Sequence, residues 1–350
     1  MDQTPEAPPA PPSKKKQVIA GLVTVVTLVI VFAGILPQLA DYGSAWDAIQ
    51  NMSVLALGLL VVATVANIVV YVWPYQAALP GIAYGPAFVV RQTSFAISNG
   101  VPAGGAFGLG VQYTMLGDYG FGPGPATATI GITSMWNTLV TLALPVLAVV
   151  ALVAVGETEA WVVSAATVGL VVVGVMVGLL ILLFRSESAA RRIGVMADRL
   201  VTWLAGLFRK EVDLGVTAKL MDFRAATLEV VRRRALAITL ANVLQQLGQF
   251  LVLYLALVGI QGDADQTTFA EALVAFSVGR LGSFVPLTPG GLGTVDAIIT
   301  GILVSFGAVE SEALAAVLLW RASTYFPQIF IGIGTFLYWR RLKTKRGSLA

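Results

Sequence analysis

The sequence contains no cysteine, no histidine and few charged residues, and each shortage removes a class of function. Without cysteine or histidine there is no disulfide, no thiolate or imidazole ligand for zinc or haem iron, and no Ser-His-Asp triad. Only 12% of the 350 residues are charged, whereas 57% are apolar and the mean hydropathy is +0.83. Soluble domains carry about 25% charged residues. We therefore expect an integral membrane protein that has no metal site and no cofactor.

Six apolar stretches have the length of a transmembrane helix, which needs roughly 20 apolar residues. These stretches are 18–36, 54–72, 126–155, 161–184, 235–260 and 314–339. Two further apolar regions, 84–116 and 269–306, are interrupted by Asn, Gly and Pro. The sequence therefore predicts an all-α integral membrane protein with six transmembrane helices and two broken helical hairpins.

The basic residues indicate the orientation. All but three of the 22 Lys and Arg lie in 14–16, 185–234 and 340–346, and cytoplasmic segments of membrane proteins carry an excess of Lys and Arg. The connections on the other side, among them 157–159 and 310–312, carry acidic residues and no basic ones. We therefore expect both termini in the cytoplasm and a multi-pass protein of the plasma membrane.

This orientation makes each broken region return to the side from which it starts. Region 84–116 begins and ends in the cytoplasm, and region 269–306 begins and ends outside. Each region is either a re-entrant hairpin or a pair of short spans. Non-helical backbone at membrane depth is tolerated only where protein or a water-filled cavity supplies its hydrogen bonds. A cavity is therefore expected beside the breaks.

The chain divides into two membrane repeats of opposite orientation. Residues 18–155 hold two spans, the first hairpin and a third span, and residues 156–340 repeat this order. A disordered cytoplasmic tail at 1–17 and a basic cytoplasmic tail at 341–350 flank the repeats. The sequence thus predicts an inverted repeat.

The two breaks support this repeat because both contain Ser, Val-Pro and Gly-Gly. Paired interruptions of this kind indicate the binding site of a transporter near the membrane midplane. Alternatively, Gly and Pro only kink two helices for packing. The break residues are Asn99, Pro102, Gly104, Gly105, Pro286, Pro289, Gly290 and Gly291.

The second break lies in the motif RLGSFVPLTPGGLGTVD at 280–296, which resembles a family of flippase-like membrane proteins related to the transmembrane part of lysylphosphatidylglycerol synthases. The motif NGVPAGG at 99–105 also matches, and the resemblance extends over 15–345. It implies a module that moves an anionic or aminoacylated phospholipid, or a polyprenyl-phosphate-linked lipid, between leaflets. The acidic position of the family is often Glu, whereas this sequence has Asp296.

Larger members of that family carry a soluble aminoacyltransferase domain after the membrane module. This sequence ends at Ala350, shortly after the last predicted span, so lipid aminoacylation is not carried over. It also has no His or Cys for a catalytic centre. These observations favour a protein that is not an enzyme and leave enzymatic activity open.

Three arginines lie outside the cytoplasmic clusters: Arg91, Arg280 and Arg321. An Arg at the centre of a transmembrane helix costs about 2.5–3.5 kcal/mol, so it normally faces a cavity or a partner. Arg280 and Arg321 are predicted to bind a lipid phosphate, with Asp296 as a partner. The alternative is a buried Arg–Asp bridge that fixes the second hairpin. Arg91 is expected to extend to lipid headgroups.

Three predicted spans carry polar residues at helical spacing, and together they predict one shared polar interior. The stripes are Thr133, Ser134, Asn137 and Thr141; Asn242, Gln245, Gln246 and Gln249; and Arg321, Thr324, Tyr325 and Gln328. The predicted substrate site combines Arg280, Arg321, Asp296, Gln246, Gln249 and Asn137. No catalytic residue and no metal ligand is predicted.

Two helix faces suggest further contacts. In the stretch 185–234, apolar residues including Ile193 and Met196 recur at helical spacing between arginines, which predicts an interfacial amphipathic helix or a helix packed under the bundle. Gly174 and Gly178 are four residues apart, a spacing that favours close packing against an internal neighbour or in a homodimer.

The sequence favours a lipid flippase or transporter. One alternative is a membrane protein that presents lipids to a separate lipid-modifying synthase. The other is a glycosyltransferase with a lipid-phosphate acceptor, for which Asp263 and Asp265 offer an Asp-x-Asp pattern. The expected partner is a membrane phospholipid or polyprenyl-phosphate lipid, with a synthase or a second copy as further candidates and no nucleic acid. No nucleotide-binding Gly-x-x-x-x-Gly-Lys loop occurs.

Overall fold

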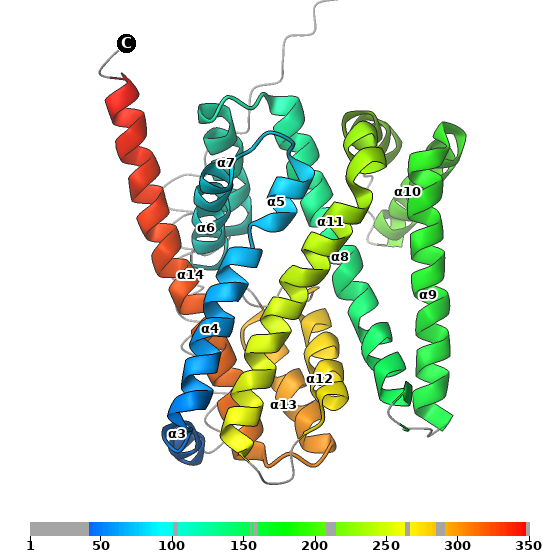
Figure 1. The fold of residues 1–350 in the computed structure, drawn as a ribbon. Helices are drawn as coiled ribbons and strands as arrows, with labels where there is room; N and C mark the ends of the chain where they lie inside the picture. The colour runs from blue at the N-terminus through cyan, green and yellow to red at the C-terminus, as the bar shows by residue number, and fades with distance from the viewer. Residues whose placement is uncertain are drawn as a thin grey trace, which may run out of the picture.

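The computed structural model describes residues 42–100, 104–154, 156, 160–207, 215–262, 267–284 and 291–347 (Figure 1). These residues form α-helices and one short 3-10 helix, and no β-strand occurs among them. The elements are α3 Tyr42–Gln50, α4 Val54–Val70, α5 Trp73–Ala78, α6 Tyr84–Gly100, α7 Gly104–Asp118, α8 Pro123–Ala154, α9 Ala160–Arg185, α10 Glu187–Leu207, α11 Val216–Gln261, α12 Phe269–Leu281, η2 Gly282–Phe284, α13 Thr294–Ser305 and α14 Glu310–Gly347.

Five helical segments are long and apolar enough to cross a membrane, and they correspond to the last five predicted spans. They are Val54–Ala78, Pro123–Ala154, Thr167–Arg185, Val216–Gln261 and Glu310–Thr344. The first predicted span, 18–36, and the tail at 1–17 lie outside the described residues. The all-α membrane architecture is therefore confirmed.

The two interrupted regions form pairs of shorter helices. Helices α6 and α7 have 17 and 15 residues, and α12 and α13 have 13 and 12. At about 1.5 Å per residue, each is shorter than the roughly 30 Å hydrocarbon core of a bilayer. Figure 1 shows the α6–α7 pair in one half of the bundle and the α12–α13 pair in the other. Long helices run past both pairs.

Contacts between the two halves are reciprocal. Helix α6 of the first pair packs against α14, the last helix of the second half, and α12 of the second pair packs against α8, the last long helix of the first half. Helix α4 of the first half packs against α11 of the second. Each short pair is thus held by the opposite half of the chain.

Local sequence explains where several helices begin and bend. Helix α4 begins after Ser53, whose hydroxyl accepts a hydrogen bond from Ala56 N at 3.1 Å. Helix α12 begins with a capping box of Thr268 and Glu271. Between α4 and α5 the helix is interrupted just before Pro74, which lacks the backbone N–H that a continuous helix needs. This interruption places α5 beside α6, α8 and α11.

The largest apolar core lies between α8, α11, α12, α13 and α14. At its centre Trp320 is fully buried, and its ring meets Phe276 edge-on at 5.9 Å between centroids. Phe276 in turn lies 5.6 Å from Phe250 of α11. This aromatic cluster anchors the second hairpin to the long helices beside it.

Helices α9 and α10 lie at the edge of the bundle (Figure 1). A Cβ on Gly174 or Gly178 of α9 would have no described atom within 4 Å beyond its own helix, so no described residue packs closely against these glycines. The two predicted partners, an internal neighbour and a second copy of the chain, therefore stay predictions. Helix α10 packs against α9 and α11. Its Ile193 is half-buried while Met196 is exposed. Part of this helix is therefore packed against α9 and α11, and part remains exposed.

Candidate functional site

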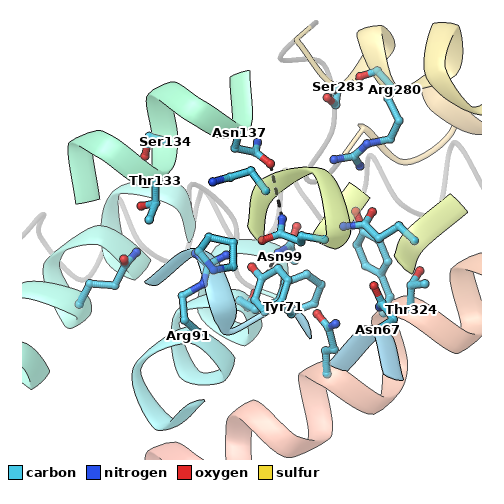
Figure 2. Close-up of a pocket in the computed structure, with 18 residues that line it drawn as sticks. Asn67, Tyr71, Arg91, Asn99, Thr133, Ser134, Asn137, Arg280, Ser283 and Thr324 are labelled. Carbon is cyan, nitrogen blue, oxygen red and sulfur yellow. Dashed lines mark hydrogen bonds between the residues drawn. The ribbon is translucent and has the colours of Figure 1, made fainter. Parts of the chain in front are cut away.

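A polar cavity of about 290 Å³ lies between the helices of both halves (Figure 2). It is lined by Asn67, Tyr71, Pro74, Arg91, Phe95, Asn99, Gln112, Thr133, Ser134, Asn137, Asn242, Gln245, Gln249, Arg280, Ser283, Thr324, Tyr325 and Gln328. Nine of these residues belong to the three polar stripes of the sequence. The predicted shared polar interior is therefore confirmed.

Two arginines supply the charge of the cavity. Arg91 comes from α6 of the first hairpin and Arg280 from α12 of the second. Figure 2 shows them reaching toward the cavity from opposite sides in that view. In the part of the chain that the structure describes, the Nε atoms of both arginines are buried without a hydrogen-bond partner, and no carboxylate lines the cavity. An anion is the ligand that this charge attracts.

The expectation that Arg91 extends to lipid headgroups is wrong. Its guanidinium carbon lies 4.2 Å from the ring centroid of Tyr71 and 5.2 Å from that of Tyr75, distances at which a cation is attracted to the ring face. Both tyrosines lie at the break between α4 and α5. The bent chain therefore covers Arg91, and the guanidinium turns into the cavity instead of toward the membrane surface.

Arg321 and Asp296 do not line the cavity. They form a buried ion pair in which Arg321 Nε donates to Asp296 Oδ1 at 2.6 Å, with side chains about 8% exposed. Asp296 Oδ2 accepts a hydrogen bond from Gly293 N at 2.8 Å, and Arg321 donates to the carbonyl oxygen of Gly291 at 3.3 Å. The pair thus holds the start of α13 against α14. This arrangement is the alternative given for these residues above, a buried Arg–Asp bridge that fixes the second hairpin.

Of the other predicted site residues, two line the cavity and one supports a lining residue from behind. Asn137 and Gln249 line it. Gln246 is fully buried and does not; its Nε2 lies 3.0 Å both from Asn137 Oδ1 and from Thr141 Oγ1. It donates to both acceptors and ties α11 to α8. We assign Gln246 to positioning Asn137 rather than to direct ligand contact.

The breaks of the two hairpins are only partly described. Asn99 lines the cavity, and its Nδ2 donates to the carbonyl oxygen of Phe95 at 2.9 Å. A Cβ on Gly104 would clash with the carbonyl oxygen of Ile97, so Gly lets the two helices of the first hairpin approach closely. Gly291 has a φ of 68°, which favours glycine. No described atom lies within 4 Å of a Cβ on Gly105.

Four break residues and the Asp-x-Asp pattern fall in the parts of the chain that the structure leaves undescribed. These are Pro102, Pro286, Pro289, Gly290, Asp263 and Asp265. Among the described residues, no group of three or more acidic side chains is placed to hold a metal ion.

Sequence reasoning missed several lining residues, and Asn67 shows why. It is the single amide in the apolar run of α4, 1% exposed, and both side-chain polar atoms lack hydrogen-bond partners among the described residues. One amide does not form a stripe, but its burial cost in a spanning helix is a usable signal. Gln112 of α7 was missed for the same reason; it hydrogen-bonds with the hydroxyls of Tyr75 and Ser94.

Long apolar helices that surround a buried cationic cavity define a multi-pass integral membrane protein with an internal polar site. A family model described as the lysylphosphatidylglycerol synthase TM region matches residues 18–332. The chain therefore belongs to this family, as its motifs indicated. No curated protein matches the chain. Membership supports a lipid-related function in the membrane.

Proposed function

We propose that this protein is a lipid flippase or transporter of the plasma membrane that binds the phosphate of a lipid headgroup in its cavity and lets it cross between leaflets. The substrate is a phospholipid or a polyprenyl-phosphate-linked lipid. The observation that carries the proposal is the pair of cavity arginines, Arg91 and Arg280, which have no carboxylate beside them in the described lining. Guanidinium groups bind phosphate through paired, charge-assisted hydrogen bonds.

The dimensions of the cavity agree with a headgroup. Its volume of about 290 Å³ is at the lower end of small-molecule sites, which hold about 300–1,000 Å³. A phosphate with a small polar substituent fits this space, whereas acyl or prenyl chains do not. The chains therefore remain in the hydrocarbon core while the headgroup crosses through the protein.

The two hairpins line the cavity from the two halves of the chain. In our proposal α6–α7 enters from the cytoplasm and α12–α13 from outside, as re-entrant hairpins of an inverted repeat with both termini inside. The reciprocal packing of α6 on α14 and of α12 on α8 supports this symmetry. One arginine then faces each side of the membrane, so a phosphate passes from one guanidinium to the other.

Transport by purified protein in vesicles tests the function. Vesicles of phosphatidylcholine and phosphatidylglycerol receive a fluorescent phosphatidylglycerol, and a membrane-impermeant quencher reports the fraction that has changed leaflet. Arg280→Gln and Arg91→Gln are each expected to slow the exchange about tenfold or more, because a charge-assisted hydrogen bond contributes about 1.5–3 kcal/mol.

Arg233→Gln is the matched control, because Arg233 is exposed and pairs with Glu229 on the surface of α11 at 3.1 Å. It should exchange lipid at the wild-type rate. Wild-type exchange by a folded Arg280→Gln variant would contradict the proposal. Lipid binding without exchange would instead favour presentation of the lipid to a separate synthase.

A further inference from the structure

We propose that the cavity selects a headgroup that combines one phosphate with neutral hydrogen-bond donors, such as hydroxyl groups, and rejects headgroups that carry amino groups. This inference rests on the proposed function and adds to it the chemical class of the substrate. An unmodified glycerol headgroup belongs to the accepted class, and a lysyl-substituted one to the rejected class. Two properties of the lining carry the inference.

The first property is a set of amide oxygens that need donors. Four residues that line the cavity have buried side-chain carbonyl oxygens without a hydrogen-bond partner among the described residues: Asn67, Asn242, Gln245 and Gln328. For Asn242 the amide nitrogen donates to the carbonyl oxygen of Ile238 at 2.8 Å. The side-chain oxygen of Asn242 is therefore the atom that has no partner among the described residues. An unsatisfied buried acceptor costs free energy.

A ligand with hydroxyl groups removes this cost. The terminal torsion of an amide side chain is broad, so a small rotation turns the oxygen toward a ligand in the cavity. A bare phosphate supplies few donors, because its oxygens chiefly accept hydrogen bonds. The arginines therefore account for the phosphate, and the amide oxygens require a second, donor-bearing part of the headgroup.

The second property is the absence of a counter-charge for a cation. No Asp or Glu is among the described residues of the lining. The undescribed residues 101–103 and 285–290, which follow α6 and η2 in the sequence, include no ionisable side chain. The acid of the nearby motif, Asp296, is engaged by Arg321 and Gly293. An ammonium group in the cavity would therefore meet two guanidinium groups and no carboxylate.

Neutral donors avoid this repulsion. Hydroxyl groups satisfy amide oxygens as well as ammonium groups do, but they add no charge to a site that already holds two cations. Like charges at a few Å repel strongly when they are shielded from bulk water. The same cavity that attracts a phosphate thus discriminates between a glycerol headgroup and its aminoacylated derivative.

Binding to the purified full chain in detergent, measured by native mass spectrometry, tests the selectivity. The probes are phosphatidylglycerol, lysyl-phosphatidylglycerol and phosphatidic acid, with soluble glycerol phosphate as a further arm. Phosphatidylglycerol should bind about tenfold or more tightly than the lysyl lipid. It should also bind several-fold more tightly than phosphatidic acid, which lacks the hydroxyl groups.

Equal or tighter binding of the lysyl lipid would overturn the inference while leaving the proposed function intact. Failure of all three lipids to bind would instead refute a phospholipid as the substrate of the proposed function, and the inference with it. Binding of glycerol phosphate as tightly as phosphatidylglycerol would show that the site recognises a soluble ligand, and would overturn the assignment to a lipid.

A charge-reversing variant tests the electrostatic part directly. Gln249→Glu places a carboxylate in the lining at nearly constant shape, and it should shift the ratio of lysyl to unmodified lipid binding about tenfold toward the lysyl lipid. Gln50→Glu is the control, because Gln50 is exposed at the end of α3, away from the cavity. An unchanged ratio in folded Gln249→Glu would show that charge does not set the selectivity.

Discussion

Replacing Asp296 by asparagine isolates the charge of the buried ion pair. Asparagine has nearly the same shape, and its carbonyl oxygen can still accept the hydrogen bond that Gly293 N donates to Asp296 at 2.8 Å. What disappears is the negative charge 2.6 Å from Arg321 Nε. Arg321 is 7% exposed, so its cation stays buried after it has lost the carboxylate of Asp296. Removing one partner of a buried pair costs about 3–5 kcal/mol.

The expected result is a lower free energy of unfolding by about 3 kcal/mol, at the low end of that range because Arg321 keeps its bond to the Gly291 carbonyl. Thermal unfolding in detergent, followed by tryptophan fluorescence, measures the change. Protease sensitivity of the connection before α13 provides a second readout, since the pair holds that connection to α14.

The double variant Asp296→Asn with Arg321→Met is the control. It removes both charges, so its stability should recover by about 2 kcal/mol or more relative to Asp296→Asn alone. A single variant as stable as wild type, or a double variant that is additive, would refute the idea that charge pairing holds α13 to α14.

Three further predictions concern helix packing, the pH dependence of the α10–α11 junction and the stability cost of Arg280 in the cavity. Gly332→Ala should destabilise the protein by about 1–3 kcal/mol in thermal unfolding, because the new methyl group would overlap the Gln92 carbonyl oxygen across the α6–α14 contact. Hydrogen bonds from the side chain and backbone of Thr217 lower the pKa of Asp198 below its usual 3.8, so protection of the α10–α11 junction against hydrogen exchange should be complete above pH 3.8 and lost as the pH falls through the lowered pKa. Arg280→Met should raise thermal stability by about 1–3 kcal/mol while lipid binding is lost, because it removes a cation whose Nε is buried and for which the described lining supplies no carboxylate.

The polar stripes were predictable because helical spacing alone places residues on one face. Gln328 follows Thr324 by four residues and Tyr325 by three, and all three residues line the cavity. Arg321 has the same spacing, yet it pairs with Asp296. It lies about one turn further toward the start of α14, level with α13. Helical spacing predicts which residues share one face of a helix. It does not predict which neighbouring helix each of these residues contacts.

The position of Arg91 was not predictable from hydropathy. Arg91 lies near the start of the first hairpin in the sequence. A residue so close to the predicted cytoplasmic end of a hairpin is expected near the membrane surface. The break at Pro74 changes this by turning α5 beside α6, so that Tyr71 and Tyr75 lie close to the guanidinium. Such a contact depends on a bend whose direction the sequence does not specify.

Arg91, Arg280 and Arg321 differ in the groups that stabilise their charges. This difference separates the arginine that joins two helices from the two that line the cavity. Arg321 has a carboxylate partner and joins two helices. Arg91 lies against tyrosine rings, and Arg280 has no carboxylate within ion-pair distance in the described parts of the chain. An acidic neighbour would lower the cost of burying Arg91 or Arg280, but it would also cancel the field that attracts a phosphate. The described lining supplies no carboxylate for the two cations of the cavity, and this lowers the stability of the protein. An anionic headgroup would supply the missing negative charge at the same place.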